Sequence, residues 1–225
     1  MTVSPVVFRS GGGPASGVLA ARGLACRRGR RLLFRGLDLT LTPGSITWLR
    51  GTNGSGKTSL MRILAGLSQP AEGSITWNDS PVRAAAGDAR RGVVYIGHTN
   101  ALKDDLTLVE SVAFLAVLAE MDEPAARARR ALDRLGLASR RDAPVRTLSQ
   151  GQRRRGALAR LALDDAPRAW ILDEPFDALD AASVDLLSRL IVAHAAGGGA
   201  VLLTSHQAIS LAGAEELDLE RWRAE

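Results

Sequence analysis

Apolar and polar residues alternate with two different periods along this chain, and these periods predict where strands and helices lie. Short apolar runs at residues 18–25 and 46–50 are typical of strands, and Pro43-Gly44 marks a tight turn before the second run. We therefore expect an antiparallel β patch at the start of the fold. The second run leads into a glycine-rich loop, and residues 58–67 then have helical spacing, so a strand, a loop and a helix follow one another.

The rest of the chain mixes short strands with helical segments. Residues 73–77 and 93–96 predict two more strands, and residues 107–137 have apolar residues at helical spacing, which indicates a helical insertion. A helix, a strand, a helix and a strand are then predicted in turn at residues 150–163, 169–172, 181–195 and 201–204. Alternating strands and helices favour a parallel sheet covered on both faces. The predicted fold class is α/β, with a mixed or parallel sheet.

Length and hydropathy limit the overall organisation. The 225 residues suffice for one α/β domain with insertions, and no internal repeat is visible. The longest uninterrupted apolar stretch, at residues 112–119, is far shorter than the roughly 20 residues that a membrane-spanning helix needs, so we expect no span. Three glycines and Pro14 stand where a secretory signal would have its apolar run, and we expect residues 1–17 to form a flexible leader.

Composition and charge exclude only a few classes of protein. Hydrophobic residues make up 46% of the chain and charged residues 24%, which argues against disordered, collagen-like and coiled-coil proteins. The formal charge of +5 comes mainly from arginine, because Lys57 and Lys103 are the only lysines. The basic residues are scattered along the chain, so the charge does not by itself indicate binding to nucleic acid or to a membrane. The single Cys26 cannot form an internal disulfide and no Cys/His cluster has metal-ligand spacing, as expected in a reducing cytoplasm.

The glycine-rich loop carries the strongest chemical signal. Residues 51–58, Gly-Thr-Asn-Gly-Ser-Gly-Lys-Thr, match the phosphate-binding pattern GxxxxGK[ST] between an apolar strand and a helix. Such glycines let successive N–H groups and the helix N-terminus face an anion, while Lys57 adds a point charge for the β- and γ-phosphates. The Thr58 hydroxyl is the expected Mg²⁺ ligand. The expected nucleotide-binding residues here are Gly51, Thr52, Asn53, Gly54, Ser55, Gly56, Lys57, Thr58 and Ser59.

Two acidic residues end the apolar run at residues 169–172. We expect Asp173 to hold Mg²⁺ through water and Glu174 to polarise the attacking water. A phosphate loop followed by such acids is compatible with GTPases, kinases and many ATPases, so these two motifs leave the class open.

A third motif, Leu148-Ser149-Gln150-Gly151-Gln152, separates these classes. Ser149 and Gln152 have the S-x-x-Q spacing of a capping box, and Gly151 permits close backbone approach, so this helix start is a second expected anion site. Residues 148–152 resemble the signature of ATP-binding cassette (ABC) proteins. The other family motifs follow in the usual order, and the resemblance extends from residue 18 to about residue 207.

The resemblance implies an ATPase whose cassettes form a head-to-tail homodimer with ATP at the interface. ATP on the phosphate loop of one subunit is then capped by Ser149 and Gly151 of the other, with Gln152 beside them. Glu174 is assigned as the general base, and His206 as the group that contacts the γ-phosphate. Asp180, in the loop after the paired acids, is assigned as the link across the dimer.

The same resemblance implies a single ABC ATPase domain at residues 18–225. Within it we expect a nucleotide-binding core with the β patch at about residues 18–97 and 165–225. An inserted helical subdomain with the signature is expected at about residues 98–164.

Two positions depart from the family pattern. An aromatic residue usually stacks on adenine about two dozen positions before the phosphate loop, but residues 26–28 are Cys-Arg-Arg, and an arginine could stack there instead. Most cassettes have a glutamine where this chain has His98. Either the γ-phosphate sensor is weakened, or His98 replaces it as a catalytic group.

The second departure narrows the resemblance. Residues 95–98, 101–103, 170–176 and 203–207 are similar to the ATP-binding subunits of bacterial cytochrome c maturation (haem exporter) complexes. That resemblance implies integral membrane subunits on separate chains and a peripheral position on the cytoplasmic face of the inner membrane. It also implies that ATP hydrolysis is coupled to haem export or to release of a haem-loaded chaperone. The chaperone would then be an indirect partner of this chain.

Two other functions remain open at this point. The chain could be the ATPase subunit of another ABC importer or exporter, which residues outside the His98 region do not distinguish. It could also be an ABC ATPase that acts on ribosomes or nucleic acid, but such proteins resemble fused double cassettes or carry coiled-coil insertions. This chain has one cassette and no heptad run, so we expect no nucleic-acid partner.

Overall fold

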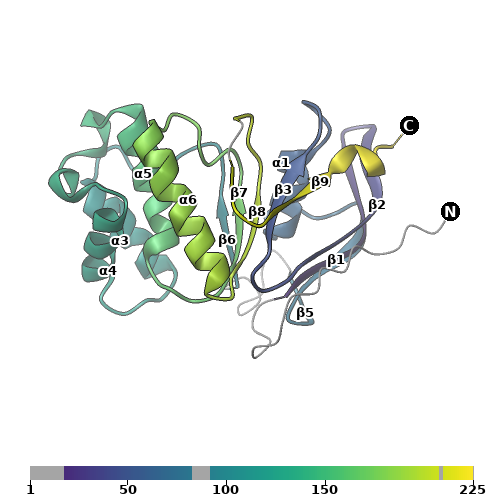
Figure 1. Cartoon of the computed structure of the whole chain (residues 1–225), viewed down its shortest axis with the longest axis horizontal. Coiled ribbons are helices and arrows are strands. Elements are labelled where there is room, and N and C mark those ends of the chain that lie inside the picture. The colour runs from purple at the N-terminus through teal and green to yellow at the C-terminus, as the bar shows by residue number, and fades with distance from the viewer. Residues whose placement is uncertain (1–17, 83–91, 208–209, 225) are drawn as a thin grey trace. The chain divides into compact units, whose positions relative to one another are not determined.

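The structure is a computed structural model that describes residues 18–82, 92–207 and 210–224. The leader predicted at residues 1–17 lies outside this part of the chain. The chain divides into two compact units (Figure 1). The first unit contains the described residues up to 95, residues 167–173 and the described residues from 192 onward; the second contains residues 96–166 and 174–191.

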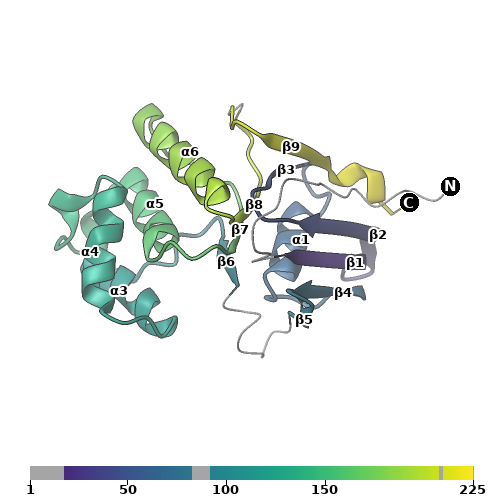
Figure 2. The same cartoon turned by 60° about the horizontal axis from the view of Figure 1, so that its bottom comes forward.

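One sheet of the first unit is antiparallel and has the strand order β2-β1-β4-β5 (Figure 2). Its strands are β1 (Leu19–Arg28), β2 (Arg31–Leu41), β4 (Glu72–Trp77) and the short β5 (Ser80–Pro81). β1 pairs antiparallel with β2 on one side and with β4 on the other. The predicted N-terminal β patch is therefore confirmed.

The other sheet of the first unit has the strand order β6-β7-β8-β3-β9. Its strands are β6 (Val93–Ile96), β7 (Ala169–Leu172), β8 (Ala200–Leu203), β3 (Ile46–Arg50) and β9 (Ala214–Asp218). β3 runs parallel to both β8 and β9, and β7 runs parallel to β8. The predicted α/β class with a parallel sheet is confirmed.

Helix α1 (Lys57–Leu64) follows β3 and the glycine-rich loop. Its buried side chains belong to one apolar core that also contains Phe34 of β2 and Leu202 of β8. These buried side chains of α1 are Leu60, Met61, Ile63 and Leu64. Full burial of such a side chain contributes about 1.5–3 kcal/mol. The core therefore fixes the first turn of α1, and with it the end of the loop, against both sheets.

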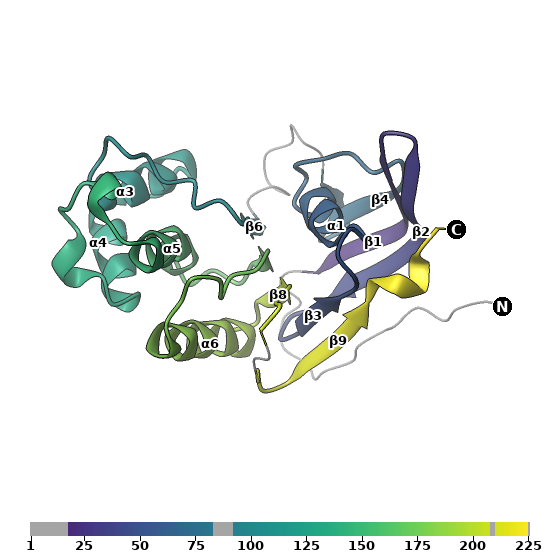
Figure 3. The ribbon, with the colours of Figure 1, turned by 90° about the horizontal axis from the view of Figure 1, so that it is seen from above.

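The second unit is helical (Figure 3). Its helices are α3 (Leu108–Leu118), α4 (Pro124–Arg134), α5 (Gln150–Leu158) and the first part of α6 (Ala181–Ala196). Short 3-10 helices are η1 (Ala138–Arg140), η2 (Val145–Thr147) and η3 (Ala159–Ala162). A Cβ at Gly156 would lie 2.7 Å from Leu108 Cδ1, so a glycine is needed where α5 approaches α3. In the part of the chain that the structure describes, no helix is long and apolar enough to cross a bilayer.

Several elements differ from the sequence predictions. Strand β2 was missed because three consecutive apolar residues, 32–34, break the alternation, and because Gly36, with a φ of 70°, lies where the pairing with β1 shifts register. Strand β9 was missed because only Leu217 among its five residues is buried. The helical stretch at residues 107–137 is two helices, since Glu120 and Glu123 adopt positive φ between α3 and α4. The stretch at 150–163 is α5 followed by a 3-10 helix.

Candidate active site

The phosphate loop, residues 51–58, joins β3 to α1 in the first unit. Gly51 has a φ of 145° and Gly56 a φ of 106°, both in the region that side chains with a Cβ avoid. A Cβ at Gly51 would lie 2.8 Å from Ser55 Oγ, and one at Gly56 would lie 3.2 Å from the Phe34 ring. The loop thus closes so tightly that glycine is required at both positions.

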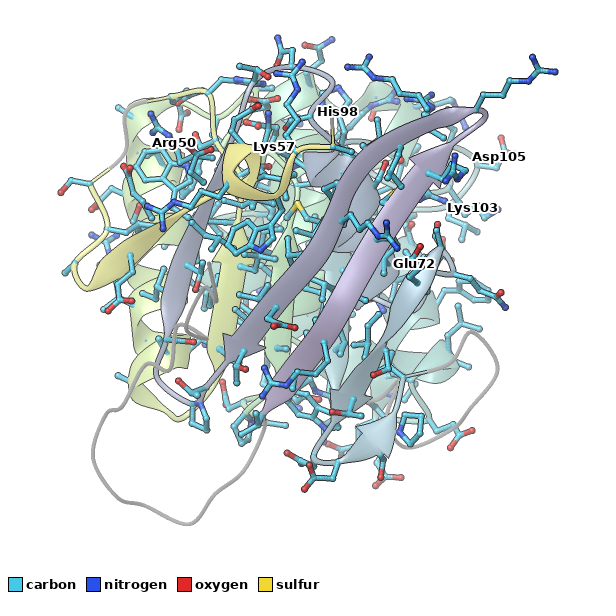
Figure 4. All side chains as sticks on the ribbon, turned by 90° about the vertical axis from the view of Figure 1, so that its right-hand side faces the viewer. Arg50, Lys57, Glu72, His98, Lys103 and Asp105 are labelled. Carbon is cyan, nitrogen blue, oxygen red and sulfur yellow. The ribbon has the colours of Figure 1, made fainter. Side chains whose placement is uncertain are left out.

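Hydrogen-bond donors gather where the loop becomes a helix. Gly56 is the N-cap of α1 and no side chain caps this helix, so the N–H groups of its first turn are available to an anion. Ser55 Oγ is buried and has no hydrogen-bond partner among the described residues. Lys57 Nζ donates to Gly51 O at 2.7 Å and to Thr52 O at 3.2 Å, so the ammonium group lies over the loop (Figure 4). An uncapped helix start, an unpaired hydroxyl and a cation fit a polyphosphate.

The remaining predicted residues of this loop are accessible. Thr58, Asn53 and Gly54 are exposed, and Ser59 is half-buried in the first turn of α1. Burial raises the pKa of the Cys26 thiol, and a hydrogen bond with Ser59 opposes that shift. Cys26 is thus a buried core residue next to the helix start, while Arg27 and Arg28 after it are exposed.

A residue from the far end of the chain holds the start of the loop. The Glu220 carboxylate, in the 3-10 helix η4 (Leu219–Trp222), accepts bonds from Thr52 N at 2.9 Å and Thr52 Oγ1 at 2.6 Å. The same carboxylate accepts from Arg223 Nη1 at 3.1 Å. These bonds lower the pKa of Glu220 below its ordinary value, and the bonds from Thr52 contribute most. The Glu220 carboxylate is therefore ionised near neutral pH. Sequence reasoning missed Glu220, because nothing in the pattern relates it to a residue 168 positions away.

Asp173 follows β7 in the first unit and is only 4% exposed. Its Oδ1 accepts a hydrogen bond from Thr204 Oγ1, a fully buried hydroxyl just after β8, at 3.1 Å. Tyr95 of β6 bonds to Asp173 as well. Burial first, and then the charge of Asp173, raises the pKa of Tyr95, so the phenol keeps its proton and donates. Two hydroxyls that sequence reasoning did not assign to the site therefore orient the predicted Mg²⁺ ligand.

His206, the predicted γ-phosphate contact, lies two residues beyond Thr204 in the same unit and is exposed. The third histidine of the chain, His194, stacks on Trp170 with the ring centroids 3.6 Å apart and contacts Arg168 O at 2.9 Å. His194 therefore has a packing role.

Glu174, the predicted general base, belongs to the second unit and is 9% exposed. Its φ of 48° is in the left-handed region, which non-glycine residues rarely adopt and which is common among residues at functional sites. His98 lies in the same unit, with Nδ1 3.7 Å from Asp177 Oδ2, and its side chain is exposed. The second unit thus contains a buried acid in a constrained backbone and an exposed histidine beside another acid.

The signature loop, residues 148–152, forms the N-terminus of α5. Ser149 Oγ accepts from Gln152 N at 3.2 Å, and Gln152 Oε1 accepts from Ser149 N at 3.1 Å, which is the capping box that the spacing predicts. A Cβ at Gly151 would lie 3.0 Å from Ala178 O, so this glycine permits the close backbone approach that was expected of it. The hydrogen of the Ser149 hydroxyl stays available as a donor, and the side chain is exposed.

Asp180 begins α6 by accepting a hydrogen bond from Ser183 N at 2.8 Å. Bonds from the side chain and backbone of Ser183 lower the pKa of Asp180, so its carboxylate is ionised at neutral pH. The geometry gives Asp180 a helix-capping role. Its role across a dimer interface stays a prediction.

The predicted residues fall into two groups, one in each unit. The first unit contains the phosphate loop, which follows β3, Asp173, which follows β7 of the same sheet, and His206. The second unit contains the other group: His98, Ser149, Gly151, Gln152, Glu174 and Asp180. Asp173 and Glu174 are consecutive, so the chain passes from one group to the other at that peptide bond.

Comparison with known proteins identifies close relatives. The ABC transporter family model matches residues 34–177. The cytochrome c biogenesis ATP-binding export protein CcmA of Aromatoleum aromaticum is 48% identical over 84% of this chain and 89% of that protein. The protein of the same name from Haemophilus influenzae is 40% identical over 92% of this chain and 97% of its own length.

Solved structures show the same fold. A putative ABC transporter ATP-binding protein from Pyrococcus furiosus has a TM-score of 0.78 and 21% identity, over 92% of this chain and all of that one. The dimeric structure of MJ0796, a bacterial ABC transporter cassette, has a TM-score of 0.77 and 21% identity, over 89% of this chain and 94% of that one.

Proposed function

Because this chain belongs to the ABC transporter family, among the cytochrome c biogenesis ATP-binding export proteins, we propose that it hydrolyses ATP to drive haem export or release of a haem-loaded chaperone. The chain is an ABC-type ATPase subunit for cytochrome c maturation. The identity of 40–48% with such proteins over most of the chain carries this conclusion. One phosphate loop and one signature helix start in the same chain provide its chemistry.

We propose that the first unit binds the ATP phosphates. Lys57 exchanges its bonds to Gly51 O and Thr52 O for oxygens of the β- and γ-phosphates, and the open amides of α1 bind the same groups. Thr58 and Asp173 hold Mg²⁺, since hydroxyl and carboxylate oxygens are the ligands that this ion prefers. When bound, Mg²⁺ neutralises the charge that develops on the phosphates. Thr204 and Tyr95 keep the Asp173 carboxylate oriented for that purpose.

The catalytic groups are proposed as follows. Glu174 orients the attacking water and accepts its proton, and His206 contacts the γ-phosphate. His98 stands in for the glutamine that most cassettes have at its position. A second copy of the chain completes each site, because Ser149 offers an exposed hydroxyl and Gly151 permits close backbone approach at the start of α5, where a γ-phosphate can be capped from the partner cassette.

A partner in the membrane is proposed on helix α3. Phe114, Val117 and Leu118 are 46%, 54% and 65% exposed, and their spacing puts them on neighbouring turns of one helix face. We name these three residues the α3 patch. Lys103 and Asp105, which precede α3, are also exposed (Figure 4). Exposed apolar side chains of this size on one helix face are typical of a protein interface. We propose that a separate integral membrane subunit docks here and keeps the chain at the cytoplasmic face of the inner membrane.

Membrane docking can be tested together with the function. In a strain that lacks the native gene, the wild-type chain should restore haem-stained c-type cytochromes and should copurify with integral membrane proteins. The double substitution Val117→Glu and Leu118→Glu should abolish both, because a charged patch cannot enter an apolar interface. ATP hydrolysis by the purified variant should persist.

The matched control is Ala125→Glu, an exposed position on α4, which should behave as wild type. Normal cytochrome c maturation by the α3 patch variant would contradict the docking site. Failure of the wild-type chain to restore c-type cytochromes would contradict the proposed function itself.

The proposed role of His98 predicts a graded response to substitution. His98→Ala should lower ATP turnover about tenfold or more, because Glu174 then acts on the attacking water without the side chain that stands in for the glutamine. His98→Gln should keep most of the activity, since an amide can also donate and accept. Steady-state ATPase rates at saturating Mg-ATP measure both. Asp177→Asn, which removes the neighbouring charge, controls for the contact between His98 Nδ1 and Asp177 Oδ2 at 3.7 Å. Wild-type turnover in His98→Ala would remove His98 from the mechanism.

A further inference from the structure

Arg154 of helix α5 is buried to an extent unusual for an arginine. Only 3% of the residue is exposed, and its guanidinium group lies inside the second unit. A buried cation is costly unless its donors are satisfied in good geometry, so the partners of such a group identify what it holds in place.

The guanidinium group of Arg154 bonds to two separate segments. Nη2 donates to Glu174 O at 2.6 Å, and Nε donates to Pro175 O at 3.3 Å. Nη1 donates to Gly97 O at 2.9 Å and to Asn100 Oδ1 at 3.4 Å. The first two acceptors are the carbonyl oxygens of Glu174 and of the residue after it. The other two belong to Gly97 and Asn100, which lie on either side of His98 in the chain.

These bonds restrain an unusual backbone conformation at Glu174. Its φ of 48° belongs to a region that a residue with a Cβ rarely adopts, so other contacts must hold it there. Two consecutive carbonyl groups, those of Glu174 and Pro175, are fixed by one planar fork. Fixing these carbonyls fixes the backbone of Glu174 and hence the direction in which its carboxylate leaves the chain.

We propose that Arg154 is a positioning residue that holds the backbone of Glu174 and the segment around His98 in the geometry needed for hydrolysis. The inference rests on the proposed function, in which Glu174 activates water. Arg154 also lies on α5, the helix that the signature loop begins, five residues after Ser149 and two after Gln152. Helix α5 therefore connects Ser149, which is proposed to cap the phosphate, with Arg154, which bonds to the backbone of Glu174.

The test compares two arginines of the second unit. Arg154→Lys keeps the charge but loses the planar fork, so ATP turnover should fall roughly 10- to 100-fold, as expected when a catalytic group is misplaced by about 1 Å. ATP affinity, measured with a fluorescent ATP analogue, should change less than about twofold. Arg129→Lys is the control, because Arg129 is exposed on α4 and bonds to Asp142, outside the loops proposed to act on ATP. Its turnover should remain that of wild type.

A double-mutant cycle separates positioning of Glu174 from general stabilisation. In the Glu174→Gln background, Arg154→Lys should lower the residual turnover much less than in the wild-type background, since one of the two groups that it positions is already lost. Arg154→Gln, which removes the buried charge, serves as a second variant if the lysine variant does not fold. Circular dichroism and thermal melting establish which variants are folded.

Three results would overturn the inference. They are wild-type turnover in folded Arg154 variants, an equal loss in both backgrounds, and a loss of ATP affinity that parallels the loss of turnover. Full turnover in Glu174→Gln alone would instead contradict the proposed function, whatever the Arg154 variants do. The two failures are therefore distinguishable.

Discussion

Glu174→Gln should lower ATP turnover by at least about 100-fold while ATP binding is retained. Glutamine has almost the same shape as glutamate, and the bonds from Arg154 go to backbone carbonyls, so the buried site should keep its geometry. The amide cannot accept a proton from water. Since both phosphate-binding helix starts remain intact, the variant should accumulate as an ATP-bound dimer.

Two measurements check this expectation. Single-turnover hydrolysis gives the chemical rate, and size-exclusion chromatography with and without Mg-ATP gives the fraction of dimer. Glu215→Gln, an exposed carboxylate on β9, is the control and should change neither quantity. Hydrolysis near the wild-type rate would show that Glu174 is not the base.

Lys57→Ala should fail at an earlier step, nucleotide binding itself. The ammonium group is the compact charge of the phosphate loop, and in the structure it already lies over Gly51 O and Thr52 O. Removing it should weaken ATP affinity about 100-fold, because a charge-assisted contact to the phosphates is lost. Isothermal titration with ATP at constant ionic strength measures the change.

The chain supplies a matched control for this experiment. Lys103 is the only other lysine, and its exposed side chain lies outside the phosphate loop. Lys103→Ala makes the same change in net charge, so it should leave ATP affinity within about twofold of wild type. Equal affinities for Lys57→Ala and wild type would remove Lys57 from the binding site.

Much of the fold could be predicted because its signals are local. The strand before the phosphate loop and the helix after it were both expected, and β3 and α1 occupy those places. The capping box of Ser149 and Gln152 was expected from three-residue spacing, which alone brings the two side chains within hydrogen-bond reach. Among the strands that were missed, β2 and β9 are kept extended by their pairing and not by their own alternation.

The sequence by itself determined the chemistry of each motif. Glycines at positions 51 and 56 permit the loop, Lys57 supplies its charge, and consecutive acids at 173 and 174 end a buried strand. These properties belong to contiguous residues, whose geometry is set by short-range sterics and hydrogen bonds. For that reason they could be read without knowing the rest of the fold.

Only the tertiary structure decided what holds these groups in place. Glu220 reaches Thr52 across 168 residues, Thr204 reaches Asp173 across 31, and Arg154 holds Glu174 across 20. Each contact depends on which strands and helices are neighbours, and strand order is set by burial of a shared core, not by any single segment. A motif fixes which atoms react, whereas packing fixes their direction, because a side chain's orientation depends on every element that surrounds it.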